Sequence, residues 1–490
     1  MLQLIFALMM VYYSNNYYVI TEKENIAKAL YENHEQYLET SIQHRRFKHT
    51  DILSIIHNLE KNQLFQVTTL GKSLEGREIF QIKLGRGKTK VLLWSQMHGD
   101  EPTATMAILD MFNFFSQNDD LDPIKEQILG NLTIYFIPML NPDGAEVYQR
   151  RNAQELDLNR DALRLESPEA KILKSAQERI KPDFGFNLHD QNTRYTAGKT
   201  SNPATISFLA PPYDQKKSVN QVRQNAMQLI VQLNEVLQNF IPGQIGKYSD
   251  EFEPRAFGDN FQKWGTSTIL VESGGYAGDT EKQYIRKLNF TILLTALAAI
   301  SEETYKEAET EMYYQIPENE LYLYDLIIRN VSFNEGGKSF TGDIGINRAE
   351  NNDHTYQNYF YSSTIEEIGD MSVFFGYEEF NADGLTVTPG KIYPDPFQNV
   401  NALEKINPKE LLKQGYTTVI VENLPSDFEY SPFPLNIAGS KNWKEPKVLT
   451  TDSPPDFILK KDEKAVYAVV NGFFYDLVQD QDLVKNGMIY

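Results

Sequence analysis

The stretch VLLWSQMHGDEP, residues 91–102, decides the fold of this chain. Its first four residues form an apolar run that is typical of a buried strand, and Pro102 suits the first turn of a helix. Apolar side chains then recur at helical spacing over residues 106–115. His98 and Glu101 are therefore expected on a strand-to-helix turn, and both residue types are ligands that Zn²⁺ accepts.

Two ligands do not make a metal site, so a third is expected at another strand end. His189 follows a short strand-like run at residues 184–188. Together with His98 and Glu101 it would give two imidazoles and one carboxylate, with a fourth position open for water, as in catalytic zinc sites. Taken alone, His-x-x-Glu is more often an ordinary turn, so the prediction depends on what else the sequence holds.

Further polar motifs follow other strand-like runs in a fixed order. NPDG spans residues 141–144, RRN spans 150–152, DLNR spans 157–160, and TILVESGG at 268–275 ends a strand in a carboxylate. As an ordered set these motifs resemble those of the M14 (carboxypeptidase A-like) zinc carboxypeptidases, over about residues 50–302. The resemblance implies an α/β domain with a mixed central sheet flanked by helices.

The resemblance also implies a catalytic role for each matching residue. His98, Glu101 and His189 would bind one Zn²⁺. Glu272 would be the general base that activates the metal-bound water, and Arg150 would polarise the scissile carbonyl. These residue types suit the chemistry, because zinc lowers the pKa of bound water, a carboxylate can take its proton, and a cation stabilises an oxyanion.

Substrate binding is implied for a second group of residues. Asn159 and Arg160 match the family's pair that binds the terminal carboxylate of the substrate, and a planar guanidinium suits that task. The family also carries a tyrosine upstream of the catalytic glutamate. Tyr248 is the tyrosine of that region, although it lies a few residues early, and Arg255 is an alternative occupant of the same space.

These features predict a zinc-dependent metallopeptidase that acts on peptides and releases C-terminal residues. Two alternatives stay open: an M14-like amidase acting on cell-wall peptides or N-acyl amino acids, and a peptide-binding protein without catalysis. The presence of His98, Glu101, His189 and Glu272 opposes the last alternative, because a chain that had lost catalysis would be free to replace them.

Composition indicates an acidic protein of at least two domains. The chain has 490 residues, 41% of them hydrophobic, and a formal net charge of −20. This charge argues against nucleic acid as a partner, because phosphates require basic surfaces. The chain has no cysteine, which excludes disulfides and thiolate ligands for zinc.

The N-terminal segment, residues 1–45, carries an apolar run at residues 2–11. This run has the length of a signal-peptide core and is too short to span a bilayer, so no stable membrane insertion is expected. It lacks a basic start, so two interpretations stay open: a truncated or degraded signal, and a helix that packs on the domain. The first would favour export over the cytoplasm. Residues 15–60 carry apolar side chains at helical spacing, and the catalytic domain is expected at 46–303.

A charged stretch at residues 304–320 predicts a linker. After it, apolar and polar residues alternate and turn-forming residues become frequent. We expect residues 321–490 to form an all-β accessory domain, with strand-like runs at 323–330, 340–346, 372–376 and 465–474. DGLTVTPG at residues 383–390 is faintly similar to the β-rich flanking domain of amidohydrolases. The HxH metal motif of those enzymes is missing, so we expect this domain to be non-catalytic.

Overall fold

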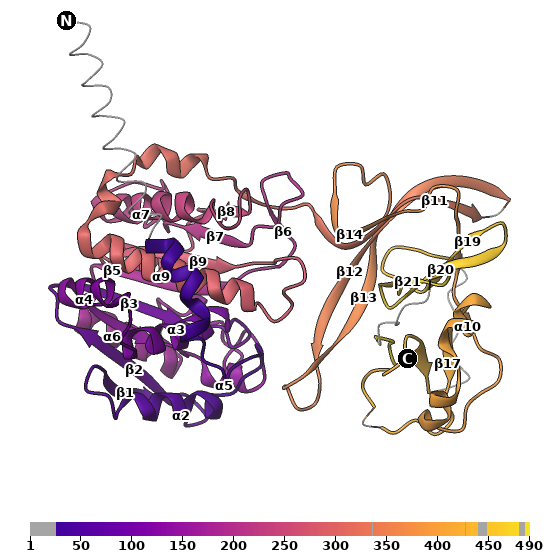
Figure 1. Ribbon diagram of the computed structural model, residues 1–490, viewed down its shortest axis with the longest axis horizontal. Helices are drawn as coiled ribbons and strands as arrows, with labels where there is room; N and C mark the ends of the chain where they lie inside the picture. The colour runs from indigo at the N-terminus through magenta and orange to yellow at the C-terminus, as the bar shows by residue number, and fades with distance from the viewer. Residues whose placement is uncertain (1–25, 336, 427, 440–447, 480–485) are drawn as a thin grey trace, which may run out of the picture. The chain divides into compact units, whose positions relative to one another are not determined.

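The computed structural model describes residues 26–490 apart from 336, 427, 440–447 and 480–485, and it divides into two compact units after Leu321 (Figure 1). The apolar run at residues 2–11 lies outside the described residues. Within the described part of the chain, no helix combines the length and apolarity needed to cross a membrane.

The first unit is built on a mixed eight-stranded sheet with the order β1-β2-β4-β3-β5-β9-β7-β8. Its four central strands, β4, β3, β5 and β9, are parallel. Strand β2 runs antiparallel to β1 and β4, and β7 runs antiparallel to β9 but parallel to β8. The prediction of a mixed α/β sheet is therefore confirmed. The strands are β1 Gln66–Lys72, β2 Glu78–Gly85, β3 Thr89–Ser95, β4 Leu132–Ile137, β5 Phe184–Asp190, β7 Ile206–Leu209, β8 Ile245–Lys247 and β9 Ser267–Ser273.

Helices cover both faces of this sheet, which explains why its central strands read as continuous apolar runs. In β3, Val91 and Leu93 pack into the core that includes α3, α7 and α9, whereas Leu92 and Trp94 pack into the core with α6 and α8. The helices are α2 His49–Leu59, α3 Thr103–Ser116, α4 Asp122–Asn131, α5 Pro142–Glu146, α6 Pro168–Ile180, α7 Gln221–Leu237, α8 Phe257–Lys263 and α9 Gln283–Glu302.

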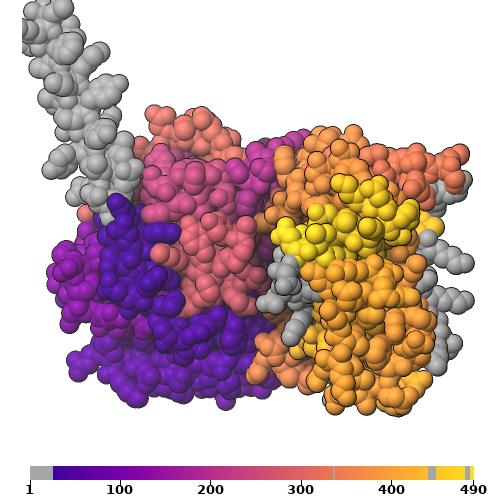
Figure 2. Space-filling view, turned by 45° about the vertical axis from the view of Figure 1, so that its right-hand side comes forward, coloured from indigo at the N-terminus to yellow at the C-terminus, as the bar shows by residue number. Residues whose placement is uncertain are grey.

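The segment before α2 belongs to the same core. Residues 26–37 are helical, but the helical pattern predicted up to residue 60 is interrupted at 38–48. The buried guanidinium of Arg286 holds this interruption in place, because it donates to the carbonyls of Glu39 and Ile42 and to the carboxylate of Asp110. In Figure 2 these indigo residues lie beside the salmon residues of α9.

The stretch predicted as a linker packs against the first unit. It contains η2 Thr304–Glu307, η3 Thr310–Gln315 and the start of β10 Asn319–Leu321. Tyr313 is buried and its hydroxyl accepts a hydrogen bond from the backbone N–H of Ala210. Strand β10 pairs with β6 Tyr195–Ala197, so the chain leaves the first unit as an ordered strand.

The second unit is largely antiparallel β structure. Its main sheet has the order β13-β12-β11-β15-β19-β20-β21, with β14 also paired to β11, and a smaller sheet has the order β16-β17-β18. The elements are β11 Leu323–Glu335, β12 Lys338–Asn352, β13 Tyr359–Gly369, β14 Phe375–Asn381, β15 Thr386–Pro389, β16 Lys391–Ile392, η4 Val400–Lys405, α10 Pro408–Lys413, β17 Tyr416–Ile420, β18 Asn436–Ala438, β19 Phe457–Lys461, β20 Lys464–Val470 and β21 Phe473–Asp476.

Two details of the predicted strands are wrong. The run at 372–376 becomes a strand only from Phe375, and the run at 465–474 is a hairpin of β20 and β21 rather than one strand. The hairpin turns at Asn471 and Gly472, whose φ angles of 48° and 73° are left-handed. An Asn-Gly pair is a strong signal for such a turn.

Candidate metal centre

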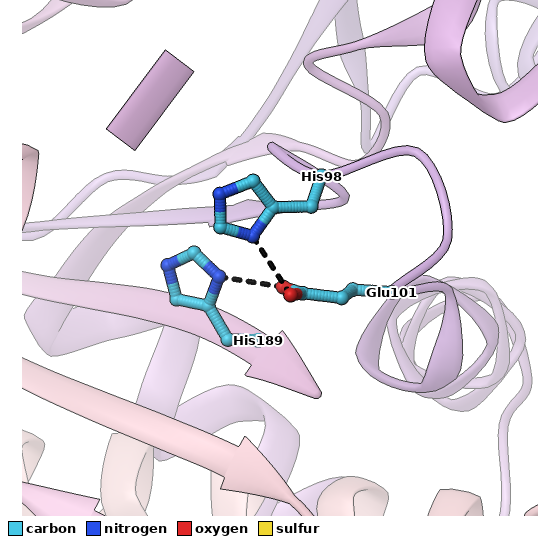
Figure 3. A group of neighbouring side chains, drawn as sticks. All are labelled: His98, Glu101 and His189. Carbon is cyan, nitrogen blue, oxygen red and sulfur yellow. Dashed lines mark hydrogen bonds and ion pairs between the residues drawn. The ribbon is translucent and has the colours of Figure 1, made fainter. Parts of the chain in front are cut away.

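Three side chains converge at the carboxyl ends of the central strands. Figure 3 shows the rings of His98 and His189 turned toward the carboxylate of Glu101. His98 Nδ1 lies 2.8 Å from Glu101 Oε1, and His189 Nδ1 lies 2.6 Å from Glu101 Oε2. All three residues are buried, and one ligand atom from each lies within 4.8 Å of the others. The site therefore sits where open α/β sheets bind their ligands.

The loop that carries His98 and Glu101 depends on close backbone packing. A Cβ atom at Gly99 would lie 2.0 Å from the carbonyl carbon of Gly144, so only glycine fits there. Gly144 is held in turn by Asn141, whose side-chain oxygen accepts its backbone N–H at 2.9 Å. The NPDG motif thus forms the surface against which the loop with His98 and Glu101 packs.

Asp157 lies beside His98, although the sequence pattern predicted it only as part of the DLNR loop motif. Its carboxylate lies 3.1 Å from His98 Nε2 and accepts hydrogen bonds from Arg150 at 3.0 and 3.1 Å. Ligating histidines usually bond a carboxylate through their second nitrogen, which fixes the ring and its tautomer. The same preference could have predicted a carboxylate partner for His98, with Asp157 as a candidate.

Two carboxylates place negative charge beside His98, whereas burial lowers the pKa of His189. Although burial opposes it, the carboxylates of Glu101 and Asp157 raise the pKa of His98 to about 9. His189 Nε2 is buried and has no hydrogen-bond partner among the described residues, so the polar contact of this ring is the one that Nδ1 makes with Glu101. Two imidazoles and one carboxylate with their donor atoms facing one another fit Zn²⁺.

Glu272 lies on the strand next to the one that carries His189. The two residues are paired in register on the parallel strands β5 and β9, which lie about 4.8 Å apart. Glu272 is buried, and burial raises the pKa of its carboxyl well above the usual value, with a further contribution from Glu101. A carboxyl with a raised pKa suits proton transfer near neutral pH.

Arg150 reaches the metal ligands from the loop after α5. Its Nη1 lies 3.1 Å from His98 Nδ1 and 3.3 Å from Glu101 Oε1, and its side chain is 43% exposed. The guanidinium can therefore contact both the ligand atoms and a molecule that arrives from solvent.

The residues expected to bind substrate lie around this centre. Asn159 and Arg160 form the short helix η1 Leu158–Arg160, directly after Asp157. The side-chain oxygen of Asn159 accepts the backbone N–H of Phe257 at 2.9 Å, which ties η1 to the start of α8. Arg160 is exposed, and its Nε lies 3.4 Å from Glu253 Oε2, a partner that the sequence did not suggest.

Tyr248 lies at the edge of the same site. Its ring meets that of Tyr195 edge-on at 6.2 Å, and burial raises the pKa of its hydroxyl, followed by the negative charge of Glu272. Arg255, the alternative occupant of this space, is exposed and pairs with Glu253.

Comparison with known proteins gives the family of this part of the chain. Residues 52–222 match the family described as zinc carboxypeptidase, Peptidase M14. These residues belong to the M14 zinc carboxypeptidases. The matched segment contains His98, Glu101 and His189, whereas Glu272 lies beyond it, so the assignment of Glu272 depends on the strand register.

The relatives match only part of this chain. Carboxypeptidase SOL1 of Arabidopsis thaliana is 27% identical over 144 residues, which are 26% of this chain and 29% of the relative. Carboxypeptidase D of Homo sapiens is 26% identical over 134 residues, 24% of this chain and 10% of the relative. A metallo-carboxypeptidase structure from Burkholderia cenocepacia has a TM-score of 0.44 at 17% identity and covers 53% of this chain and 70% of that one. The chain thus spans less than a third of these two curated relatives.

Proposed function

We propose that this protein is a zinc metallocarboxypeptidase that hydrolyses peptide bonds and releases C-terminal residues. The observation that carries the proposal is the convergence of His98, Glu101 and His189, with Glu272 directly across from His189 on the neighbouring strand. Bound Zn²⁺, held by the two Nδ1 atoms and the Glu101 carboxylate, would supply Lewis-acid chemistry that polarises the scissile carbonyl and lowers the pKa of a water.

The chain's own residues would handle charge and protons. Glu272 takes a proton from the attacking water at its carboxylate and passes it to the leaving amine. Arg150, whose Nη1 lies beside the ligand atoms, places a positive charge where the oxyanion develops. Asp157 holds both Arg150 and the His98 ring in orientation.

The substrate's terminal carboxylate would bind at η1. Arg160 offers a guanidinium that is partly exposed to solvent, and the side-chain amide N–H of Asn159 adds a donor beside it. Tyr248, whose hydroxyl pKa is raised by burial and by the charge of Glu272, would cover the bound residue. In this arrangement Arg160 binds the terminal carboxylate of the substrate, and Glu272 transfers the proton during hydrolysis of the last peptide bond.

A second candidate function is an amidase that acts on another amide, such as a cell-wall peptide or an N-acyl amino acid. One observation favours it: the guanidinium of Arg160 already lies against an internal carboxylate, that of Glu253. This contact favours amide substrates that have no free α-carboxylate next to the scissile bond, because they would lose less binding at such a site.

The experiment that tests the proposal compares three substrates on the full chain after zinc has been restored. They are a blocked peptide with a free C-terminus, the same peptide with a C-terminal amide, and an N-acyl amino acid. Release of the last residue from the free peptide, abolished by a zinc chelator and recovered with Zn²⁺, would support a carboxypeptidase. Equal cleavage of the free and the amidated peptide would support the amidase, and no cleavage of any substrate would contradict both.

A further inference from the structure

The carboxylate of Glu253 lies beside the guanidinium of Arg160, which would bind the terminal carboxylate of the substrate. Glu253 Oε2 lies 3.4 Å from Arg160 Nε. We propose that Glu253 is a specificity-determining residue that lowers the affinity of Arg160 for a free terminal carboxylate. This inference rests on the proposed function, which assigns the terminal carboxylate to Arg160.

Glu253 is fixed in this place by contacts that do not involve Arg160. Its backbone N–H donates to Asp259 Oδ1 at 3.0 Å. Its carboxylate accepts hydrogen bonds from Arg255 Nε at 2.9 Å and Arg255 Nη2 at 2.7 Å, a bidentate pair. The carbonyl of Arg255 is held by the backbone N–H of Ala162, two residues beyond Arg160. The carboxylate is therefore presented to η1 by a rigid backbone.

Glu253 is ionised at any pH at which the enzyme would work. The hydrogen bonds from Arg255, with the nearby charge of Arg160, lower the pKa of its carboxyl to about 2. A substrate carboxylate at Arg160 would consequently arrive beside a full negative charge, and like charges at such distances repel.

The effect should be moderate, because the charges are partly solvated. The side chains of Arg160 and Arg255 are 39% and 57% exposed, so water screens the interaction. Arg255 offsets part of the repulsion but is itself engaged by Glu253. A change of about three- to tenfold in the affinity for a free carboxylate fits charges separated by a few ångströms at a protein surface.

Glu253 could instead serve to orient Arg160, in which case its removal would weaken binding. The geometry opposes this role. The contact is an ion pair at 3.4 Å, whereas Arg160 Nη1 donates a 2.8 Å hydrogen bond to the carbonyl of Asn159. Arg160 thus has its own anchor on η1, and Glu253 contributes charge rather than position.

The first test compares the zinc-loaded full chain with Glu253→Gln on one blocked peptide in its free-acid and amidated forms. KM for the free acid should fall about three- to tenfold, while KM for the amide and kcat for both stay within about twofold. Glu251→Gln, an exposed carboxylate two residues earlier, is the matched control and should change neither KM. An unchanged or higher KM for the free acid, or an equal fall for the amide, overturns the inference.

A binding measurement separates this inference from the proposed function, because it needs no turnover. Calorimetry with an N-acetyl amino acid and its amide should show tighter binding of the acid alone in Glu253→Gln and in Glu253→Ala, which serves if one variant folds poorly. The gain should vanish in an Arg160→Gln background, as a double-mutant cycle requires for a direct coupling. A gain that persists without Arg160, or no gain in either variant, rejects the role of Glu253 even if the enzyme hydrolyses peptides.

Discussion

The two units of the chain bury ionisable groups in contrasting ways. In the first unit His98, Glu101 and His189 face one another, and within the described residues they are the one group of side chains that could hold a metal ion. In the second unit Asp456 is buried, but its carboxylate accepts the backbone N–H of Asn471 at 2.7 Å and the hydroxyl of Tyr490 at 2.6 Å. Burial alone therefore does not mark a functional group.

What distinguishes the two cases is the partner. Asp456 satisfies donors that hold its own unit together, so its role is explained by structure. The three groups of the first unit are potential metal ligands whose ligand atoms face one another, with Asp157 and Arg150 around them, and a bound cation would stabilise this arrangement. The histidine of the second unit, His354, has a side chain 70% exposed and lies 3.2 Å from Glu429, as a surface group would.

The largest effect expected from this contrast is loss of the metal. His98→Ala and His189→Ala should each reduce zinc from about one per chain to none, because two remaining ligands bind Zn²⁺ poorly. Metal analysis of the purified proteins measures this, with His354→Ala as the control that keeps its zinc. Unchanged zinc content in both variants would remove these histidines from the metal site.

The next effect separates the base from the ligands. Glu272→Gln keeps the shape of the side chain and should leave zinc content unchanged, but kcat should fall about 10²–10⁴-fold because the proton acceptor is lost. Steady-state kinetics on a free-acid peptide, with metal analysis alongside, would show both. A variant with full turnover would exclude Glu272 from proton transfer.

A smaller effect is expected one step further from the metal, at Asp157. Asp157→Asn removes the negative charge beside His98 Nε2 and Arg150, and such partners of ligating histidines contribute about 10–100-fold in metal affinity or activity. Zinc titration against a competing chelator measures the change, and Glu155→Gln on the same loop is the control. Equal zinc affinity and equal kcat in the variant and the parent would show that Asp157 is only structural.

The local features of this site could be predicted from the sequence. Strand β3, the turn with His98 and Glu101, and helix α3 all follow from patterns within a few residues, and the structure confirms them. The Asn-Gly turn at Asn471 and Gly472 was equally local, yet the apolar run around it suggested one strand where the chain forms a hairpin.

The parts that could not be predicted are pairings between distant segments. The register that sets His189 opposite Glu272 joins strands separated by α7 and β8, and no spacing in the sequence fixes it. Likewise, Glu253 reaches Arg160 because the 253–257 loop is bonded to η1 through Asn159 and Ala162. Such contacts set the charges around the site, whereas the local motif places the potential metal ligands His98 and Glu101.

The smallest effect is expected in the second unit, where it tests whether the buried carboxylate of Asp456 has only a structural role. Asp456→Ala leaves the buried Asn471 N–H without its acceptor and removes one hydrogen bond of the Tyr490 hydroxyl, and a buried donor without a partner costs about 1–3 kcal/mol. The variant should therefore unfold at lower denaturant concentration in the transition of the second unit, while zinc content and peptide hydrolysis stay at the parent's values. Chemical denaturation with zinc analysis measures both. A variant of unchanged stability that lost zinc or hydrolysis would mean that Asp456 serves the site, and burial with local partners would then no longer separate structural from functional groups in this chain.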